Sequence, residues 1–241
     1  MDLNFTFEKD LKNSEGGEYE FVPLGNYEIK DTSNYVDYQG NKLFSKGIGG
    51  LTNGDGFYLN KPLQLFSKSF TLEYYWISKD KHTGHTQTSF AIFKENKIDR
   101  IFYLYSSGSS NDSYNWNDIS NSIIKKIFID KNQAGQCLIE KWNYIKIIYD
   151  NFTISVFSNN YNIFSYNVDK TYSNDLYYIG VGLSSIIGNE NKYSHLGIWR
   201  NFKLNIKNDL IESNSINNTR RIIKYSNKCL AYVLGPYLSK N

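Results

Sequence analysis

The segment SSGSSNDSYNWNDISN, residues 106–121, combines aromatic rings with amides and carboxylates. Tyr114 and Trp116 are two residues apart, so in an extended segment their rings point the same way and could form a platform. Sugar rings stack their C–H faces on aromatic rings, and sugar hydroxyls pair with amides and carboxylates. We therefore predict a carbohydrate site made of Asp112, Tyr114, Asn115, Trp116 and Asn117.

An alternative reading of the same segment is structural. About sixteen residues are expected here as a surface loop between two strands, and such length is typical of functional or disordered loops. Trp116 could instead pack back into the protein and anchor that loop. The residue types alone leave both roles open for Trp116.

The segment also offers oxygen ligands to a hard cation. Asp112 and Asp118 could bind calcium, which prefers carboxylate, amide and backbone oxygens. The regular D-x-D-x-D-G spacing is absent, so solvated turn residues are the alternative. We expect no required cofactor, with calcium as an optional ligand.

Residues for catalysis are not grouped in this sequence. A retaining glycosidase needs two carboxylates about 5 Å apart, and residues two apart on a strand share a face. Neither Glu73 nor Glu140 has an acidic residue two positions away. His82 and His85 lie near each other, but a structural metal site needs about four ligands. We expect no enzyme, and a glycosidase remains an alternative.

Strands must position these residues. Of the 241 residues, 40% are hydrophobic and 17% aromatic, a composition that favours strands and excludes disorder. Apolar and polar residues alternate over short spans, which predicts antiparallel strands, among them 42–45, 70–78 and 142–149. Residues 152–167 predict a hairpin that turns at Asn159 and Asn160. The only predicted helical turn is 208–214.

Charge and cysteine usage exclude several classes of protein. The 27 basic and 24 acidic residues give a net charge of +3, too small for a protein that coats nucleic acid. No apolar run is long enough to span a membrane, and the N-terminus does not resemble a signal peptide. Cys137 and Cys229 match neither a metal-binding nor a redox spacing, and whether they pair remains open.

Four segments resemble, in order, the laminin-G-like, concanavalin A-like jelly roll of lectins, pentraxins and many modular adhesins. They are KGIGGLTNGDGFYLNKP at 46–62, SFTLEYYWISK at 69–79, a central hairpin at 141–167, and closing strands at 177–213. The resemblance implies an all-β fold, a two-sheet antiparallel β-sandwich with a short helical turn. The tryptophans inside its strand patterns should be buried, namely Trp76, Trp142 and Trp199.

The resemblance covers residues 1–214, which we assign to the sandwich, and leaves residues 215–241 as a C-terminal arm. No acidic residue follows Glu212, whereas five basic ones do, and CLAYVLGPYL then adds an apolar stretch at 229–238. A monomer would not normally expose such a stretch, so we expect the arm to contact other protein chains in a homo- or hetero-oligomer.

These observations predict a recognition module rather than an enzyme. We expect it to bind a glycan or another cell-surface component within a larger assembly such as a phage tail, a virion or an adhesin. Its expected location is extracellular or on a virion surface, without a signal peptide of its own. A structural or decoration subunit without a ligand is the alternative from a different class, because members of one fold differ in function.

Overall fold

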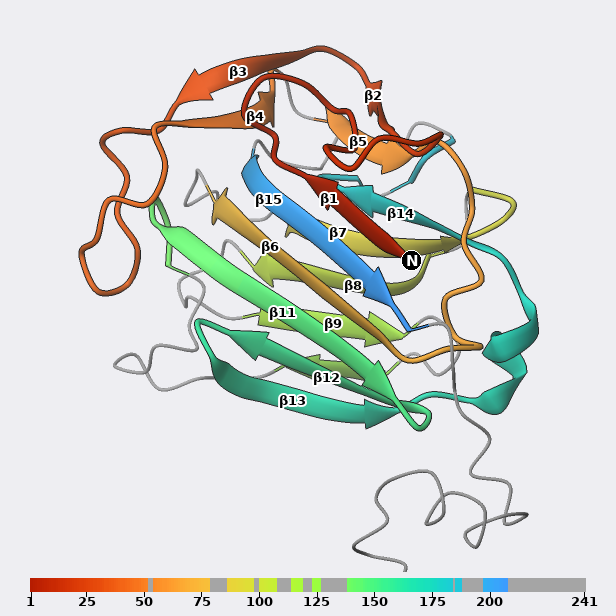
Figure 1. Cartoon of the computed structure of the whole chain (residues 1–241). Helices are drawn as coiled ribbons and strands as arrows, with labels where there is room; N and C mark the ends of the chain where they lie inside the picture. Colours follow the sequence, from red (N-terminus) through yellow and green to blue (C-terminus); the bar gives the residue numbers. More distant parts are fainter. Residues whose placement is uncertain are drawn as a thin grey trace, which may run out of the picture. The chain divides into compact units, whose positions relative to one another are not determined.

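Figure 1 shows a computed structural model of the chain, whose described regular structure is strands apart from one short 3-10 helix, η1 (Lys170–Asn174). It describes residues 1–51, 54–78, 86–97, 100–107, 114–118, 123–126, 138–183, 185–187 and 197–207. The chain divides into two units, residues 1–208 and 209–241, and all described residues belong to the first. The predicted boundary at residue 214 and the C-terminal arm lie outside the described residues.

Two antiparallel sheets form the sandwich. The front sheet, facing the reader in Figure 1, has the order β13 (Tyr161–Asn167), β12 (Thr153–Ser158), β11 (Trp142–Asp150), β6 (Phe70–Ser78), β15 (Gly197–Ile206), β4 (Lys46–Gly50) and β3 (Tyr27–Asp31), and β1 (Asp2–Phe5) also pairs with β15. The back sheet has the order β10 (Ile123–Lys126), β9 (Tyr114–Asp118), β8 (Arg100–Ser107), β7 (Thr86–Lys94), β14 (Tyr177–Val181), β5 (Gly56–Leu59) and β2 (Phe21–Leu24). The predicted all-β, two-sheet antiparallel sandwich is thus confirmed.

The alternation of β6 explains how the sequence makes this fold. In FTLEYYW the residues Phe70, Leu72, Tyr74 and Trp76 are fully buried between the sheets, while the residues between them lie on the outer face. Two buried hydrogen bonds tie the sheets together. The Tyr74 hydroxyl lies 2.8 Å from Ser89 Oγ, and Trp199 Nε1 donates to the Ser89 carbonyl at 3.0 Å.

Trp142 is buried as predicted, but not between the sheets. It packs with Ile77 and Ile198 on the outer face of the front sheet, beneath the segment 32–45. Phe44 of that segment contacts the indole edge-on, with ring centroids 5.1 Å apart. The segment is fixed at this end because the Trp142 amide donates to the Val36 carbonyl at 2.9 Å. Trp142 is therefore buried by the segment 32–45, which connects β3 to β4, and not by the back sheet.

The predicted strand at residues 42–45 is wrong. These residues lie outside the strands, in the connection between β3 and β4, although the Ser45 carbonyl accepts a hydrogen bond from the Thr32 amide at 2.9 Å. Asp37 organises the connection, since its carboxylate accepts hydrogen bonds from the amides of Gln39 and Asn41, each at 2.8 Å. Partial burial opposes ionisation of Asp37, but these hydrogen bonds outweigh it and hold the pKa of Asp37 below its ordinary value.

The predicted hairpin at 152–167 is confirmed. β12 and β13 pair in antiparallel register and are joined at Asn159 and Asn160, with φ values of 48° and 72°. Two consecutive positive φ values suit the twist of a two-residue hairpin, and asparagine adopts them more readily than most residues. The Asn159 side chain also contacts β11, the strand beside β12, because it accepts a hydrogen bond from the Tyr144 amide at 2.9 Å.

A bulge in β15 sets the outer face of the front sheet. Arg200 stands opposite Tyr75 and Lys203 opposite Glu73, so β15 uses one more residue than β6 over this span. Asn201 lies within the bulge at φ 49°, and its amide donates to the Thr6 carbonyl at 3.1 Å. A bulge of this kind re-aims side chains. Here it brings both Arg200 and Lys203 to the outer face.

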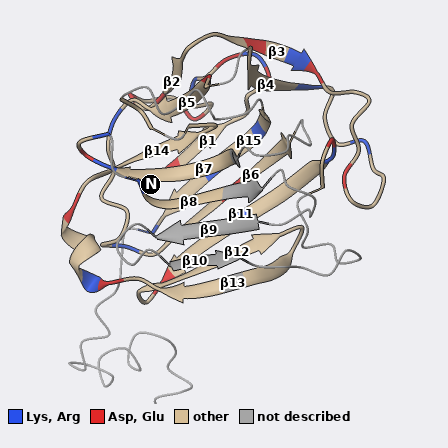
Figure 2. Cartoon of the chain, turned by 180° about the vertical axis from the view of Figure 1, so that it is seen from behind, with Lys and Arg blue, Asp and Glu red and all other residues tan. Residues whose placement is uncertain are grey.

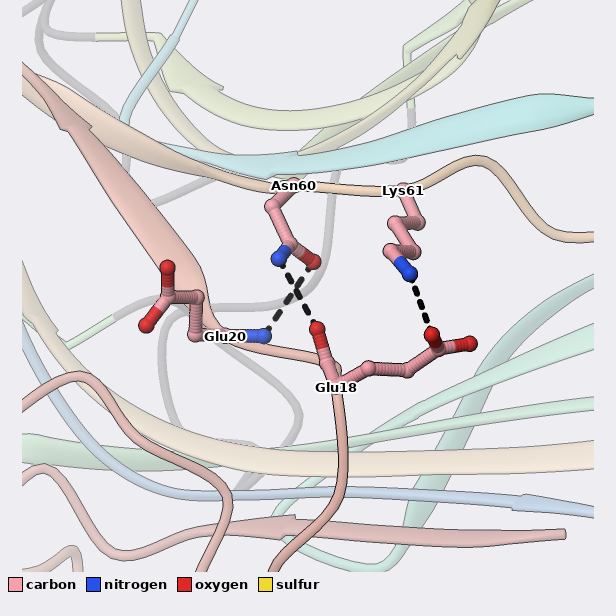
Figure 3. A network of polar contacts seen from close by, with 4 residues as sticks. All are labelled: Glu18, Glu20, Asn60 and Lys61. Carbon is pink, nitrogen blue, oxygen red and sulfur yellow. Dashed lines mark hydrogen bonds and ion pairs between the residues drawn. The ribbon is translucent and has the colours of Figure 1, made fainter.

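A polar clamp joins the segment before β2 to the end of β5 (Figure 3). The Asn60 side chain donates to the Glu18 carbonyl at 2.9 Å and accepts from the Glu20 amide at 3.2 Å. Lys61 forms an ion pair with the Glu18 carboxylate. The clamp supports the edge of the back sheet, where β2 pairs with β5. In the described part of the chain, no helix is long and apolar enough to cross a membrane.

Candidate functional site

Two adjoining pockets lie on the outer face of the front sheet. The first has a volume of about 430 Å³ and is lined by residues of β1, β6 and β15 together with Glu15. The second, of about 370 Å³, is lined by residues of β6, β11, β15 and the segment 32–45. Glu73 and Lys203 line both pockets, so the two meet there. We refer to the pair of pockets as the front groove.

Aromatic rings form one part of the front groove. Tyr75 of β6 and Tyr144 of β11 are direct neighbours across the two strands, with ring centroids 5.0 Å apart. Phe44 packs edge-on against Tyr75 at 4.9 Å. Because Phe44 also contacts buried Trp142, the indole supports the rings that line the groove.

Glu73 lies at the centre of the front groove. Its carboxylate forms an ion pair with Lys146 of β11 at 3.0 Å and accepts a hydrogen bond from the Tyr144 hydroxyl. Burial and the Glu73 carboxylate both raise the pKa of Tyr144 far above its ordinary value. Burial likewise raises the pKa of Tyr75, with the Glu73 and Asp37 carboxylates adding to the effect. Both phenols therefore stay protonated and able to donate at neutral pH.

Polar side chains form the other part of the front groove. The Asn205 side chain donates to the Asp2 carboxylate, which joins β15 to β1. Asn4 stands opposite Lys203 in the same strand pair. Lys203 is exposed, and within the described residues it forms no ion pair although it stands opposite Glu73. The groove therefore presents amide, carboxylate and ammonium groups beside its aromatic rings.

The carboxylates of the front groove come from different elements, namely Glu73 from β6, Asp2 from β1 and Glu15 from the segment that follows β1. On β6 the outer neighbours of Glu73 are Thr71 and Tyr75, so the strand offers no second carboxylate at the spacing a retaining glycosidase uses. Glu73 is also neutralised by Lys146 and held by Tyr144. In the described ranges, no group of three or more His, Cys, Asp or Glu side chains could hold a metal ion.

The sugar site predicted from the sequence lies elsewhere. Tyr114, Asn115, Trp116 and Asn117 belong to β9, whereas Asp112 lies outside the described residues. The prediction of a surface loop is wrong for residues 114–118. They form a strand that pairs on both sides, with β8 and with β10. In this register Trp116 stands opposite Leu104, which is fully buried.

The optional calcium site stays a prediction. Asp118 is the last residue of β9 and stands opposite Phe102, while Asp112 is not described. His82, His85 and the two cysteines also lie outside the described residues.

Sequence reasoning missed most of the front groove. From the sequence, Glu73 is only a carboxylate without an acidic residue two positions away, although the alternation of β6 does place Tyr75 on the same face. Nothing in the sequence indicated that Tyr144, Lys203 and Asp2 would join them. These residues lie on three other strands, and only the sheet order brings the strands together.

Comparison with known proteins supports the fold. No protein-family model matches the chain, and a search of curated proteins gives no match. Among solved structures, one similar protein is domain 4 of AbnA, a GH43 extracellular arabinanase from Geobacillus stearothermophilus, in complex with arabinotriose. The similarity has a TM-score of 0.54 at 16% identity and covers 84% of this chain and 90% of that domain.

Botulinum neurotoxin binding domains are also similar. The serotype D binding domain matches with a TM-score of 0.53 at 14% identity, covering 84% of this chain and 47% of that one. A structure of botulinum neurotoxin type C matches with a TM-score of 0.52 at 12% identity, covering 84% of this chain and 46% of that one. Cell entry of that toxin is dependent on interaction with two ganglioside molecules. The chain therefore spans about half the length of the neurotoxin domains it matches. At these identities the likeness shows a shared β-sandwich fold.

Proposed function

We propose that this chain is a non-catalytic carbohydrate-binding module of the laminin-G-like, concanavalin A-like class, and that the front groove holds the glycan. The observation that carries the proposal is the pair formed by Tyr75 and Tyr144 beside the Glu73 carboxylate inside one pocket. A domain of similar fold was solved with arabinotriose, which supports a sugar as the ligand.

Stacking supplies the apolar part of the binding. The rings of Tyr75 and Tyr144 are inclined by 39°, so together they offer a shallow platform to the C–H face of a sugar ring. Both side chains are half-buried and packed against neighbours, so they lose little freedom when a ligand binds. A ring that is already fixed in place contributes more of its contact energy to affinity.

Polar groups around the platform supply orientation. Glu73 can accept from sugar hydroxyls with its remaining lone pairs, and Lys203 and Asn205 can donate to them. Each pocket lies within the roughly 300–1,000 Å³ typical of small-molecule sites. Because the two pockets meet at Glu73 and Lys203, a linear oligosaccharide fits the groove better than a single sugar unit. We expect a monovalent dissociation constant of roughly millimolar to micromolar.

Glycan-array screening of the purified chain, followed by calorimetric titration of the best ligand, tests this function. Tyr144→Ala should weaken binding at least about tenfold, a loss of about 1.4 kcal/mol. Tyr144→Phe keeps the ring but loses the bond to Glu73, so its affinity should fall between the two. The matched control is Tyr161→Ala, which removes an exposed tyrosine of β13 and should bind like the wild type.

Three outcomes contradict the proposal. If no glycan binds, the chain is better described as a structural subunit. If Tyr144→Ala binds like the wild type while Trp116→Ala abolishes binding, the glycan site is the predicted one at residues 112–117. Sugar release by the wild-type chain would instead revive the glycosidase alternative.

The proposed function also suggests an assembly and a location for the chain. Attachment to a glycan surface suits an extracellular or virion-surface protein that is part of a phage tail, a virion or an adhesin. The segment 215–241 would join the module to other chains, as its basic and apolar composition predicts.

A further inference from the structure

The outer edge of β3 is an unpaired strand edge. β3 is the last strand in the order of the front sheet, and no described strand lies beyond it. Such an edge is a template for pairing with another strand, and natural proteins usually blunt it with proline, charge or a cover. At the corresponding edge of the back sheet, β2 contains Pro23, whereas β3 has no proline.

The hydrogen bonds of β3 show which residues have free backbone groups. The Thr32 amide donates to the Ser45 carbonyl at 2.9 Å, and the Leu51 amide donates to the Asn26 carbonyl at 3.2 Å. Both pairs continue the register of β3 with β4. Because bonded and non-bonded pairs alternate in antiparallel strands, the even-numbered residues of β3 bond to β4. Tyr27, Ile29 and Asp31 therefore direct their amides and carbonyls outward.

The side chains of β3 alternate between an apolar and a charged face, and Glu28 is half exposed whereas Lys30 is 13% exposed. Ile29 is 44% and Tyr27 41% exposed, so two large apolar side chains are exposed on this short strand. Glu28 and Lys30 lie on the other face and form an ion pair at 2.9 Å. Figure 2 shows these acidic and basic residues alternating along β3.

We propose that β3 pairs with β3 of a second copy of this chain, in antiparallel register about a two-fold axis at Ile29. This register places Ile29 opposite its own copy, and the outward backbone groups of both then form a bonded pair. It also places Glu28 opposite the partner's Lys30 and Lys30 opposite the partner's Glu28. Opposite charges directly across two strands stabilise a sheet, and like charges destabilise it.

Other edges fit a second copy less well. β13, at the far edge of the front sheet, carries no charged residue and so has no comparable complementarity. Pro23 removes a backbone donor from β2. Of the three described edges β3, β13 and β2, only β3 combines complementary charges with a full set of outward backbone groups.

The proposed pairing has a functional consequence. A two-fold axis perpendicular to the sheet joins the two front sheets into one and keeps both outer faces on the same side. Two front grooves would then face one glycan surface, and two linked sites bind more strongly than one through effective concentration. This consequence rests on the proposed function, whereas the pairing itself does not.

Sedimentation-velocity measurements on the whole chain without glycan test the pairing. A strand of five residues buries much less than the roughly 1,600 Å² of a standard interface, so the dimer should be weak and concentration-dependent. Ile29→Lys places two ammonium groups together on the axis and should abolish the dimer. Glu28→Lys alone should weaken it, because two lysines then oppose each other.

The charge-swapped variant makes the test specific. Glu28→Lys combined with Lys30→Glu restores opposite charges across the axis and should restore the dimer that Glu28→Lys loses. Tyr161→Lys on β13 is the matched control and should dimerise like the wild type. Circular-dichroism melting checks that each variant is folded.

A wild-type chain that stays monomeric at every concentration would overturn the proposal. A dimer that survives Ile29→Lys would also overturn it, since assembly would then use another surface such as the C-terminal segment or β13.

Discussion

Replacing Trp142 with alanine is expected to lower the free energy of unfolding by about 3–5 kcal/mol. The indole is fully buried and fills the space between β11 and the segment 32–45. Removing it leaves a cavity lined by Ile77, Ile198 and Phe44, because the strands on one side cannot move inward. Urea denaturation followed by circular dichroism measures the change.

The control for this substitution is Tyr161→Ala, which truncates a large side chain that is 53% exposed. It should change stability by no more than about 0.5 kcal/mol. If Trp142→Ala denatures at the same urea concentration as the control, the segment 32–45 does not cover the indole as described.

Replacing Asn143 with leucine should cost about 2–4 kcal/mol, because it leaves buried backbone groups without partners. Asn143 Oδ1 accepts from the Leu138 amide at 2.8 Å, and Nδ2 donates to the carbonyls of Leu138 at 2.8 Å and Lys141 at 3.0 Å. The side chain thus holds the turn that leads into β11. Denaturation with urea again gives the free energy of unfolding.

Two variants sharpen the test at Asn143. Asn143→Asp keeps the acceptor for the Leu138 amide but loses the two donors, so it should also be destabilised at neutral pH. Asn162→Leu changes an exposed asparagine of β13 and should be nearly neutral. Equal stability of Asn143→Leu and Asn162→Leu would show that the turn at residues 138–141 does not depend on Asn143.

The fold could be predicted where local patterns and tertiary packing agree. The alternation of β6 predicts a strand with one buried face, and the structure has that strand. Asn159 and Asn160 predict a hairpin turn because they tolerate positive φ, and both adopt it. In these cases the residues within one short segment are enough to determine its conformation.

Prediction failed where contacts outside a segment determine its structure. Residues 42–45 have a strand-like pattern, but they form no strand, and Phe44 packs against Trp142 instead. Residues 114–118 were expected in a loop because they are polar. They form a strand because β8 and β10 supply backbone partners on both sides. Pairing with another segment, even with neighbours along the chain such as β8 and β10, is not visible in the pattern of one segment alone.

The candidate site could not be predicted from the sequence for a similar reason. Its acidic and aromatic residues could be seen one at a time, but Asp2 and Asn205 are 203 positions apart. The bulge at Asn201 adds a further shift of one residue that determines which β15 side chains reach the groove. Only the sheet order and this bulge turn scattered residues into one surface.

The most direct test of the central claim is to map the glycan on the protein by NMR. The best glycan from the array would be titrated into the isotope-labelled chain, and amide shifts would be followed in heteronuclear correlation spectra. We expect the largest shifts at Glu73, Tyr75, Tyr144 and Lys203, across three adjacent strands of the front sheet. Shifts confined to β9 in the back sheet, with these four amides unmoved, would contradict the assignment of the front groove as the carbohydrate site.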